Sequence, residues 1–157
     1  GPTDGETISS ANATFTWGGN DETMEFRIHF DGALVQDWIG LKTYTFNYID
    51  EGGHAFSVQG RYANEDTSLT VHINFTVDAV GGPALIFLPR RHIATQGQSV
   101  SFEIIAEEVE DLTATEFVLR FDQNLVTIDS INAGSMFEFN QEFIFYHKID
   151  NAHLICI

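Results

Sequence analysis

Apolar and polar residues alternate along most of the chain, and this pattern predicts β-strands. In residues 24–30, Met24, Phe26, Ile28 and Phe30 alternate with charged side chains, and the pair Asp31-Gly32 that follows predicts a turn. Such alternation is typical of a strand with one buried and one exposed face. It also predicts strands at residues 13–17, 44–46, 56–62, 69–77, 100–104, 117–121 and 143–147. Helical spacing predicts only a turn or two, at residues 133–139. We therefore expect an all-β protein built from packed antiparallel sheets.

Residues 79–83 interrupt the pattern and are the predicted domain boundary. They read Ala-Val-Gly-Gly-Pro, and two glycines and a proline oppose the continuation of a strand. The break is short, so we expect a semi-rigid tandem of two β-sandwich domains, residues 1–79 and residues 83–157. A chain of 157 residues is long enough for two small domains or one large one.

The charge of the chain narrows the classes of partner. There are 7 Lys and Arg residues against 23 Asp and Glu residues, which gives a net charge of −16. Nucleic acids and anionic membranes would repel such a chain, so neither is expected as a partner. High negative charge favours solubility, as in a secreted or salt-tolerant protein, and cation binding is the alternative interpretation.

Cysteine content and apolar runs bear on the setting of the protein. Cys156 is the single cysteine, so no intramolecular disulfide can form and burial and sheet hydrogen bonds must hold the fold. No apolar run approaches the roughly 20 residues of a membrane helix, and no membrane insertion is expected. Gly1 and Pro2 are typical of the remnant of a cleaved tag, so we expect the natural N-terminus and any signal peptide to lie outside this sequence.

Residues 6–79 resemble fibronectin type III and bacterial Ig-like domains. The matching elements are ATFTWGGND, a second-strand pattern with an inward Trp17, and YIDEGGHAFSVQGRY, which is similar to the corner before the sixth strand. In those families the position of His54 often carries a tyrosine whose hydroxyl binds the corner backbone. An imidazole nitrogen could make that bond here.

Residues 84–157 resemble the N-terminal half of cohesin modules, jelly-roll-like sandwiches that bind dockerin modules. The resemblance rests on ATQGQSVSFEI, on LTATEFVLRFDQNLVTIDSI and on YHKIDNAHLICI. The strands that would close the sandwich do not follow, so the second domain is expected to be incomplete. Both resemblances imply an extracellular or cell-surface protein of a prokaryote.

Histidines and carboxylates are the two sets of candidate metal ligands in the sequence. The six histidines contain no short-spaced pair, which favours surface residues and predicts no metal centre, with a structural role for His54. Calcium needs six to eight converging oxygens. The candidate carboxylates for that alternative are Asp21, Glu22, Glu107, Glu108, Glu110, Asp111 and Asp122, with a solvated acidic face as the default.

Catalytic motifs are missing from the sequence. It contains no G-x-S-x-G, no glycine-rich phosphate loop and no Ser-His-Asp arrangement. We therefore expect no enzyme. The predicted function is protein–protein assembly, with the first domain as a spacer and the second as the binding unit.

The predicted binding face follows from the resemblance to cohesins. It would use outward residues of the strands near 117–121 and 143–147, namely Glu116, Val118, Arg120, Ile144 and Tyr146. The expected partner is a dockerin-like protein or another copy of the chain. The alternative is a carbohydrate-binding accessory module of a polysaccharide-degrading enzyme, in which Trp38 and Tyr62 would stack on sugar rings.

The last residues, Leu-Ile-Cys-Ile at 154–157, predict a terminal strand without charge. Such a strand with no successor would be an exposed edge that favours pairing with another chain. Three outcomes are open: the strand completes a reduced sandwich, the chain is a fragment, or another copy supplies the missing pairing.

Overall fold

A computed structural model describes residues 1–157 except 21–23, 138–143, 151–152 and 157. The protein is all-β, as predicted, and the described residues contain a single short 3₁₀ turn, Ser135–Phe137. The predicted helical region at 133–139 is thereby reduced to one turn, with residues 138–139 outside the described part. Contacts divide the chain into two compact units, Gly1–Glu108 and Val109–Ile157. The proposed domain boundary at 79–83 remains a prediction.

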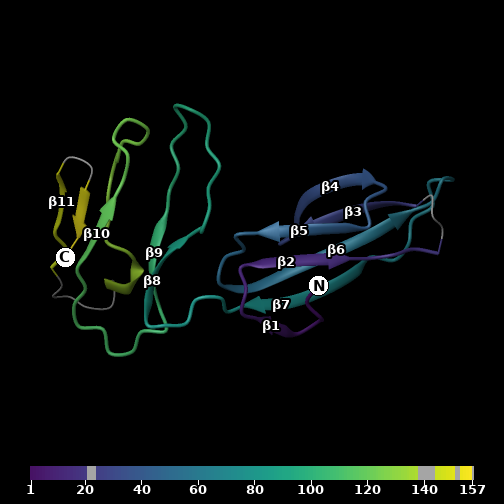
Figure 1. Ribbon diagram of the computed structural model, residues 1–157, viewed down its shortest axis with the longest axis horizontal. Coiled ribbons are helices and arrows are strands. Elements are labelled where there is room, and N and C mark those ends of the chain that lie inside the picture. Colours follow the sequence, from purple (N-terminus) through teal and green to yellow (C-terminus); the bar gives the residue numbers. More distant parts are fainter. Residues whose placement is uncertain (21–23, 138–143, 151–152, 157) are drawn as a thin grey trace. The chain divides into compact units, whose positions relative to one another are not determined.

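The first seven strands form two sheets that share one core (Figure 1). The larger sheet has the order β1-β7-β6-β3-β4, and the smaller sheet pairs β2 with β5. The bounds are Glu6–Ile8 for β1, Asn12–Thr16 for β2, Glu25–Phe30 for β3, Ala33–Ile39 for β4, Thr43–Asn47 for β5, Gly52–Arg61 for β6 and Val71–Val77 for β7. This arrangement is sandwich-like, with the inward residues of both sheets in contact.

The predicted alternation fixes which side chains enter this core. Phe26 and Ile28 of β3 are buried while their neighbours are not, and Phe75 and Val77 of β7 follow the same rule. Burial of each such side chain stabilises the fold by about 1.5–3 kcal/mol. The core is strongly aromatic because Phe residues from both sheets meet in it.

The centre of the core is a stacked aromatic pair that joins the two sheets. Phe15 of β2 and Phe56 of β6 lie with ring centroids 4.0 Å apart and an interplanar angle of 13°. Phe46 and Phe75 lie against Phe15 with tilted or edge-on rings. The fold therefore has an inter-sheet contact that needs no disulfide.

The β3–β4 hairpin turns at Asp31 and Gly32, as the sequence predicts. Their φ angles are 48° and 77°, and a two-residue turn with both φ values positive matches the right-handed twist of the flanking strands. The structure adds two strands that the pattern did not predict. They are β1, which pairs in parallel with β7, and β4, which pairs with β3 through register shifts.

A second hairpin follows in the first unit. β8 (Ala84–Leu88) pairs antiparallel with β9 (Glu103–Glu107), and Phe87 of β8 lies 6.0 Å from Phe102. The second strand begins three residues later than the predicted start at residue 100. Leu85 and Phe87 are 43% and 44% exposed, so the hairpin has an uncovered apolar face.

The second unit contains a sheet of three strands in the order β10-β12-β11. The strands are β10 (Phe117–Arg120), β11 (His147–Asp150) and β12 (His153–Cys156). The predicted exposed edge at the last strand is therefore wrong: β12 pairs with β10 on one side and with β11 on the other. The prediction failed because it considered only the neighbours of the strand in sequence.

Candidate functional site

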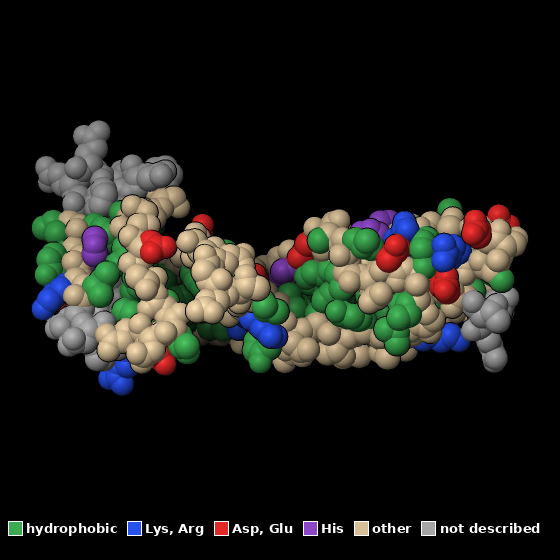
Figure 2. Space-filling model, turned by 90° about the horizontal axis from the view of Figure 1, so that it is seen from above, with side chains coloured by type: hydrophobic (Ala, Val, Ile, Leu, Met, Phe, Trp, Pro, Cys, Tyr) green, Lys and Arg blue, Asp and Glu red, His purple; other side chains and the backbone are tan. Residues whose placement is uncertain are grey.

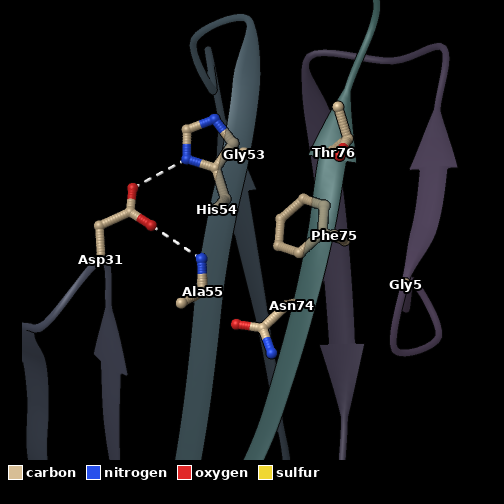
Figure 3. A pocket seen from close by; sticks show the side chains of 8 residues that line it. All are labelled: Gly5, Asp31, Gly53, His54, Ala55, Asn74, Phe75 and Thr76. Atoms are coloured by element: carbon tan, nitrogen blue, oxygen red, sulfur yellow. Dashed lines mark hydrogen bonds and ion pairs between the residues drawn. The ribbon is translucent and has the colours of Figure 1, made fainter.

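His54 lies at the centre of a polar corner at the start of β6 (Figure 3). Its Nδ1 is 2.8 Å from Oδ2 of Asp31, and its Nε2 is 2.9 Å from the backbone oxygen of Asp50. The other carboxylate oxygen of Asp31 accepts a hydrogen bond of 2.8 Å from the Ala55 backbone N–H. The structure therefore confirms that an imidazole nitrogen binds the corner backbone, and it adds Asp31 as a partner that the sequence analysis missed.

The chemistry of this corner is structural. Both ring nitrogens of His54 face oxygen acceptors, and its side chain is only 10% exposed. A general base needs a nitrogen that can reach a substrate proton. In this conformation His54 has no nitrogen free for that role. The ring instead ties the β3–β4 turn to the loop before β6.

A shallow depression of about 390 Å³ lies beside the corner and is lined by Gly5, Asp31, Gly53, His54, Ala55, Asn74, Phe75 and Thr76. Asn74 is already engaged at its backbone N–H, which donates to Asp4 at 2.8 Å. Phe75 packs on His54 with ring centroids 5.7 Å apart. Most polar groups here therefore serve the fold.

Trp38 lies on the polar side of the larger sheet, under two guanidinium groups. The Cζ atoms of Arg27 and Arg61 lie 4.4 Å and 4.8 Å from the centre of its ring. Arg27 also donates to Asp37 at 2.8 Å, and Arg61 donates to Glu25 at 2.5 Å. The Trp38 ring is thus already a cation–π acceptor.

The hydrogen bond from Arg27 lowers the pKa of Asp37, with a smaller contribution from the Trp38 backbone N–H. The carboxylate form is favoured because both groups donate to it. Similarly, the backbone N–H and then the hydroxyl of Thr3 lower the pKa of Glu6. Both acids lie at the exposed surface, so these are local effects.

Tyr62 lies elsewhere and does not form a platform with Trp38. It packs against the core cluster, and its hydroxyl donates to Oδ1 of Asn20 at 2.7 Å. It lines a cavity of about 470 Å³ together with core residues, including Phe15 and Trp17. The structure therefore does not bring the two predicted sugar contacts together, and sugar binding remains a prediction.

The five residues of the predicted partner face are all exposed. Glu116, Val118 and Arg120 lie at or beside β10, whereas Ile144 and Tyr146 precede β11, which begins only at His147. Val118 is 51%, Ile144 88% and Tyr146 51% exposed. β12 separates β10 from β11, so the residues at β10 and the two residues that precede β11 do not lie on neighbouring strands.

The carboxylates proposed for calcium have other partners or lie apart. Glu108 accepts a bond of 2.7 Å from the Gly82 N–H, and Asp122 accepts bonds from the backbone and side chain of Asn124. Asp21 and Glu22 lie outside the described residues. Within the described ranges, no three His, Cys, Asp or Glu side chains converge to hold a metal ion.

Comparison with known proteins gives no match among family models, curated proteins or solved structures. In the part of the chain that the structure describes, no helix has the length and apolar character of a membrane span. The function must therefore be argued from the residues themselves.

Proposed function

We propose that the chain is a non-catalytic module of an extracellular or cell-surface protein and that it mediates protein–protein assembly. One observation carries this proposal: no side chain whose burial is described beyond Val77 is buried, although that stretch is rich in apolar residues. Large exposed apolar surfaces are uncommon on monomeric soluble proteins and mark interaction sites. Figure 2 shows apolar side chains at the surface among polar ones.

The second unit supplies the surface that this proposal uses. Val118, Ile144 and Tyr146 are at least half exposed, and Arg120 adds a charged group two residues after Val118 on β10. Aromatic residues and arginine are enriched at protein interfaces, and the fully buried centre of an interface is depleted of charge. A protein partner, either a dockerin-like module or a second copy of this chain, fits these side chains better than a polysaccharide does.

We also propose that the first seven strands form an Ig-like domain that acts as a spacer. In Ig domains a disulfide joins the second and sixth strands, and a corner tyrosine lies two residues before the second cysteine. Phe15 of β2 and Phe56 of β6 make the corresponding contact here, and His54 lies two residues before Phe56. The bond from His54 to the Asp50 carbonyl supports the same interpretation.

The test is binding by the complete 157-residue chain. Light scattering after size exclusion, over a series of concentrations, measures self-association, and calorimetry with an isolated dockerin module measures the other partner. We expect one of these interactions, and we expect Ile144→Asp to weaken it by at least about tenfold because it places a charge in an apolar interface.

Leu41→Asp is the matched control, because Leu41 is an exposed apolar residue of the first seven-strand region, 44% exposed. It should leave binding unchanged. The proposed function would be refuted if the chain stayed monomeric at high concentration and showed no binding to dockerin modules. Equal loss in both variants would place the interface elsewhere and would also contradict it.

A further inference from the structure

The loop between β5 and β6 carries a buried carboxylate with an unusual set of partners. The side chain of Glu51 is only 8% exposed. Its two oxygens lie 3.2 Å and 3.0 Å from the backbone N–H of Ala79, which follows β7. A buried charge is costly unless it is hydrogen-bonded and paired, so this single N–H is not enough for it.

The positive charge that pairs with Glu51 belongs to Arg90, which follows β8. Nη2 of Arg90 donates to Oε1 of Glu51, and the Arg90 side chain is 21% exposed. The Arg90 backbone N–H also donates to Oδ1 of Asp50 at 2.6 Å. Next to it, the guanidinium of Arg91 lies 5.0 Å from the centre of the Tyr48 ring.

These contacts have a topological consequence. Ala79 precedes β8 and Arg90 follows it, so Glu51 holds the chain on both sides of that strand. Asp50 is itself held, because its carbonyl lies 2.9 Å from Nε2 of His54 at the start of β6. All of these residues belong to the compact unit Gly1–Glu108.

We propose that Asp50, Glu51, Ala79 and Arg90 form a junction clasp, an electrostatic device that fixes the β8–β9 hairpin to the seven-strand region. Opening the clasp releases both ends of β8 and frees the hairpin with its exposed Leu85 and Phe87. Removal of one partner from a buried ion pair leaves an uncompensated charge, so the clasp opens when either Glu51 or Arg90 is lost. This device is independent of the binding face proposed for the second unit.

Trypsin provides the first test, because it cleaves after arginine and a residue held in the clasp is protected. Glu51→Ala frees the Arg90 guanidinium, and cleavage after Arg90 should become about tenfold faster as local opening becomes more frequent. Asp37→Ala is the matched control: it removes an exposed carboxylate partner from Arg27. It should leave cleavage at residues 90 and 91 at the wild-type rate. Mass spectrometry assigns each cut.

A second variant keeps the test decisive if Glu51→Ala does not fold. Arg90→Met removes the guanidinium and its charge and keeps an unbranched apolar stem, and the backbone amide of Ala79 should then exchange with solvent faster. Tryptophan fluorescence confirms that the seven-strand region is still folded. Unchanged cleavage in folded Glu51→Ala, or unchanged exchange at Ala79 in Arg90→Met, overturns the clasp.

Discussion

The seven-strand region and the strands beyond residue 83 differ in how far their apolar side chains are buried. Phe15, Phe26, Ile28, Phe56 and the other buried apolar residues all come from the first region. The later strands alternate in a similar way, yet Val118 on one face of β10-β12-β11 and Ile149 on the other are about half exposed, at 51% and 47%. An alternating pattern thus makes strands, and a core forms only where a second sheet supplies facing side chains.

The difference has an energetic meaning. In the first region the Phe15–Phe56 stack joins two sheets, so each aromatic ring removes apolar surface of the other from water. In the β8–β9 hairpin, Phe87 meets Phe102 edge-on and remains 44% exposed. An isolated two-stranded hairpin is marginally stable at best in water. The β8–β9 hairpin therefore depends more on contacts outside its own two strands than the seven-strand region does.

The same truncation in the two regions should have the most unequal effect. Phe15→Ala removes the central ring of the core and should lower the free energy of unfolding by about 3–5 kcal/mol. Phe87→Ala removes an exposed ring and should cost less than about 1 kcal/mol. Urea unfolding followed by tryptophan fluorescence is the measurement, because the only two tryptophans, Trp17 and Trp38, both lie in the seven-strand region. Equal losses would show that the contrast between the regions is not one of burial.

Replacement of the corner histidine, His54, should reduce the free energy of unfolding by less than Phe15→Ala does. His54→Phe keeps a ring of similar size and removes both polar contacts, leaving Asp31 and the Asp50 carbonyl without their partner. It should lower the free energy of unfolding by about 1 kcal/mol, because the partly buried Asp50 carbonyl loses its donor, whereas the Asp31 side chain is 46% exposed and can bind water. His54→Tyr retains one hydroxyl and should fall between wild type and His54→Phe.

The control for the corner is His72→Phe, because His72 lies exposed on β7. It should change the free energy of unfolding by no more than about 0.5 kcal/mol. If His54→Phe were as stable as wild type, the corner would not contribute to the stability of the first region. Thermal and urea unfolding of the four proteins give the comparison.

Local sequence was a good guide wherever a strand alternates and its neighbours are close in sequence. β3 and β7 were predicted because inward Phe and Ile residues recur every second position, and the Asp31–Gly32 turn was predicted from its two residues. β4 was missed because its register with β3 shifts twice, which breaks the alternation. β1 is only three residues long and depends on its partner β7.

Contacts between distant segments could not be predicted in this way. The pairing of β12 with β10 joins residues more than thirty positions apart, and no local period encodes it, whereas the pairing of β12 with β11 is a local hairpin. At the corner, the resemblance indicates that His54 could bind the corner backbone without naming Asp50, whereas Asp31 lies 23 positions away and is not indicated at all. Sequence reasoning also treated Trp38 as a surface ring and missed the two guanidinium groups above it.

The smallest expected effect concerns the polar face of the seven-strand region. The pKa of Asp37 is lowered mainly because the Arg27 side chain donates a hydrogen bond to its carboxylate. Arg27→Ala should therefore raise the pKa of Asp37 toward 3.8, the ordinary value of an aspartate. Carbon-detected NMR of the carboxyl group during an acid titration measures this change. Arg120→Ala, which removes the same charge in the second unit, should leave the titration of Asp37 unaltered.

The sign of the linked stability follows from the direction of this shift. A carboxylate whose pKa is lower in the folded protein stabilises the fold above its unfolded pKa, and the contribution is lost as the pH falls through the folded value. Arg27→Ala should thus slightly reduce the acid dependence of unfolding of the seven-strand region, with little effect near neutral pH beyond the loss of an exposed ion pair. Because the Asp37 side chain is more than half exposed, solvent screens the interaction, and the change in pKa is a clearer measure than stability. If Arg27→Ala left the titration of Asp37 unchanged, the arginines over Trp38 would not determine the pKa of that carboxyl. The contrast between the two regions would then rest on the buried core alone.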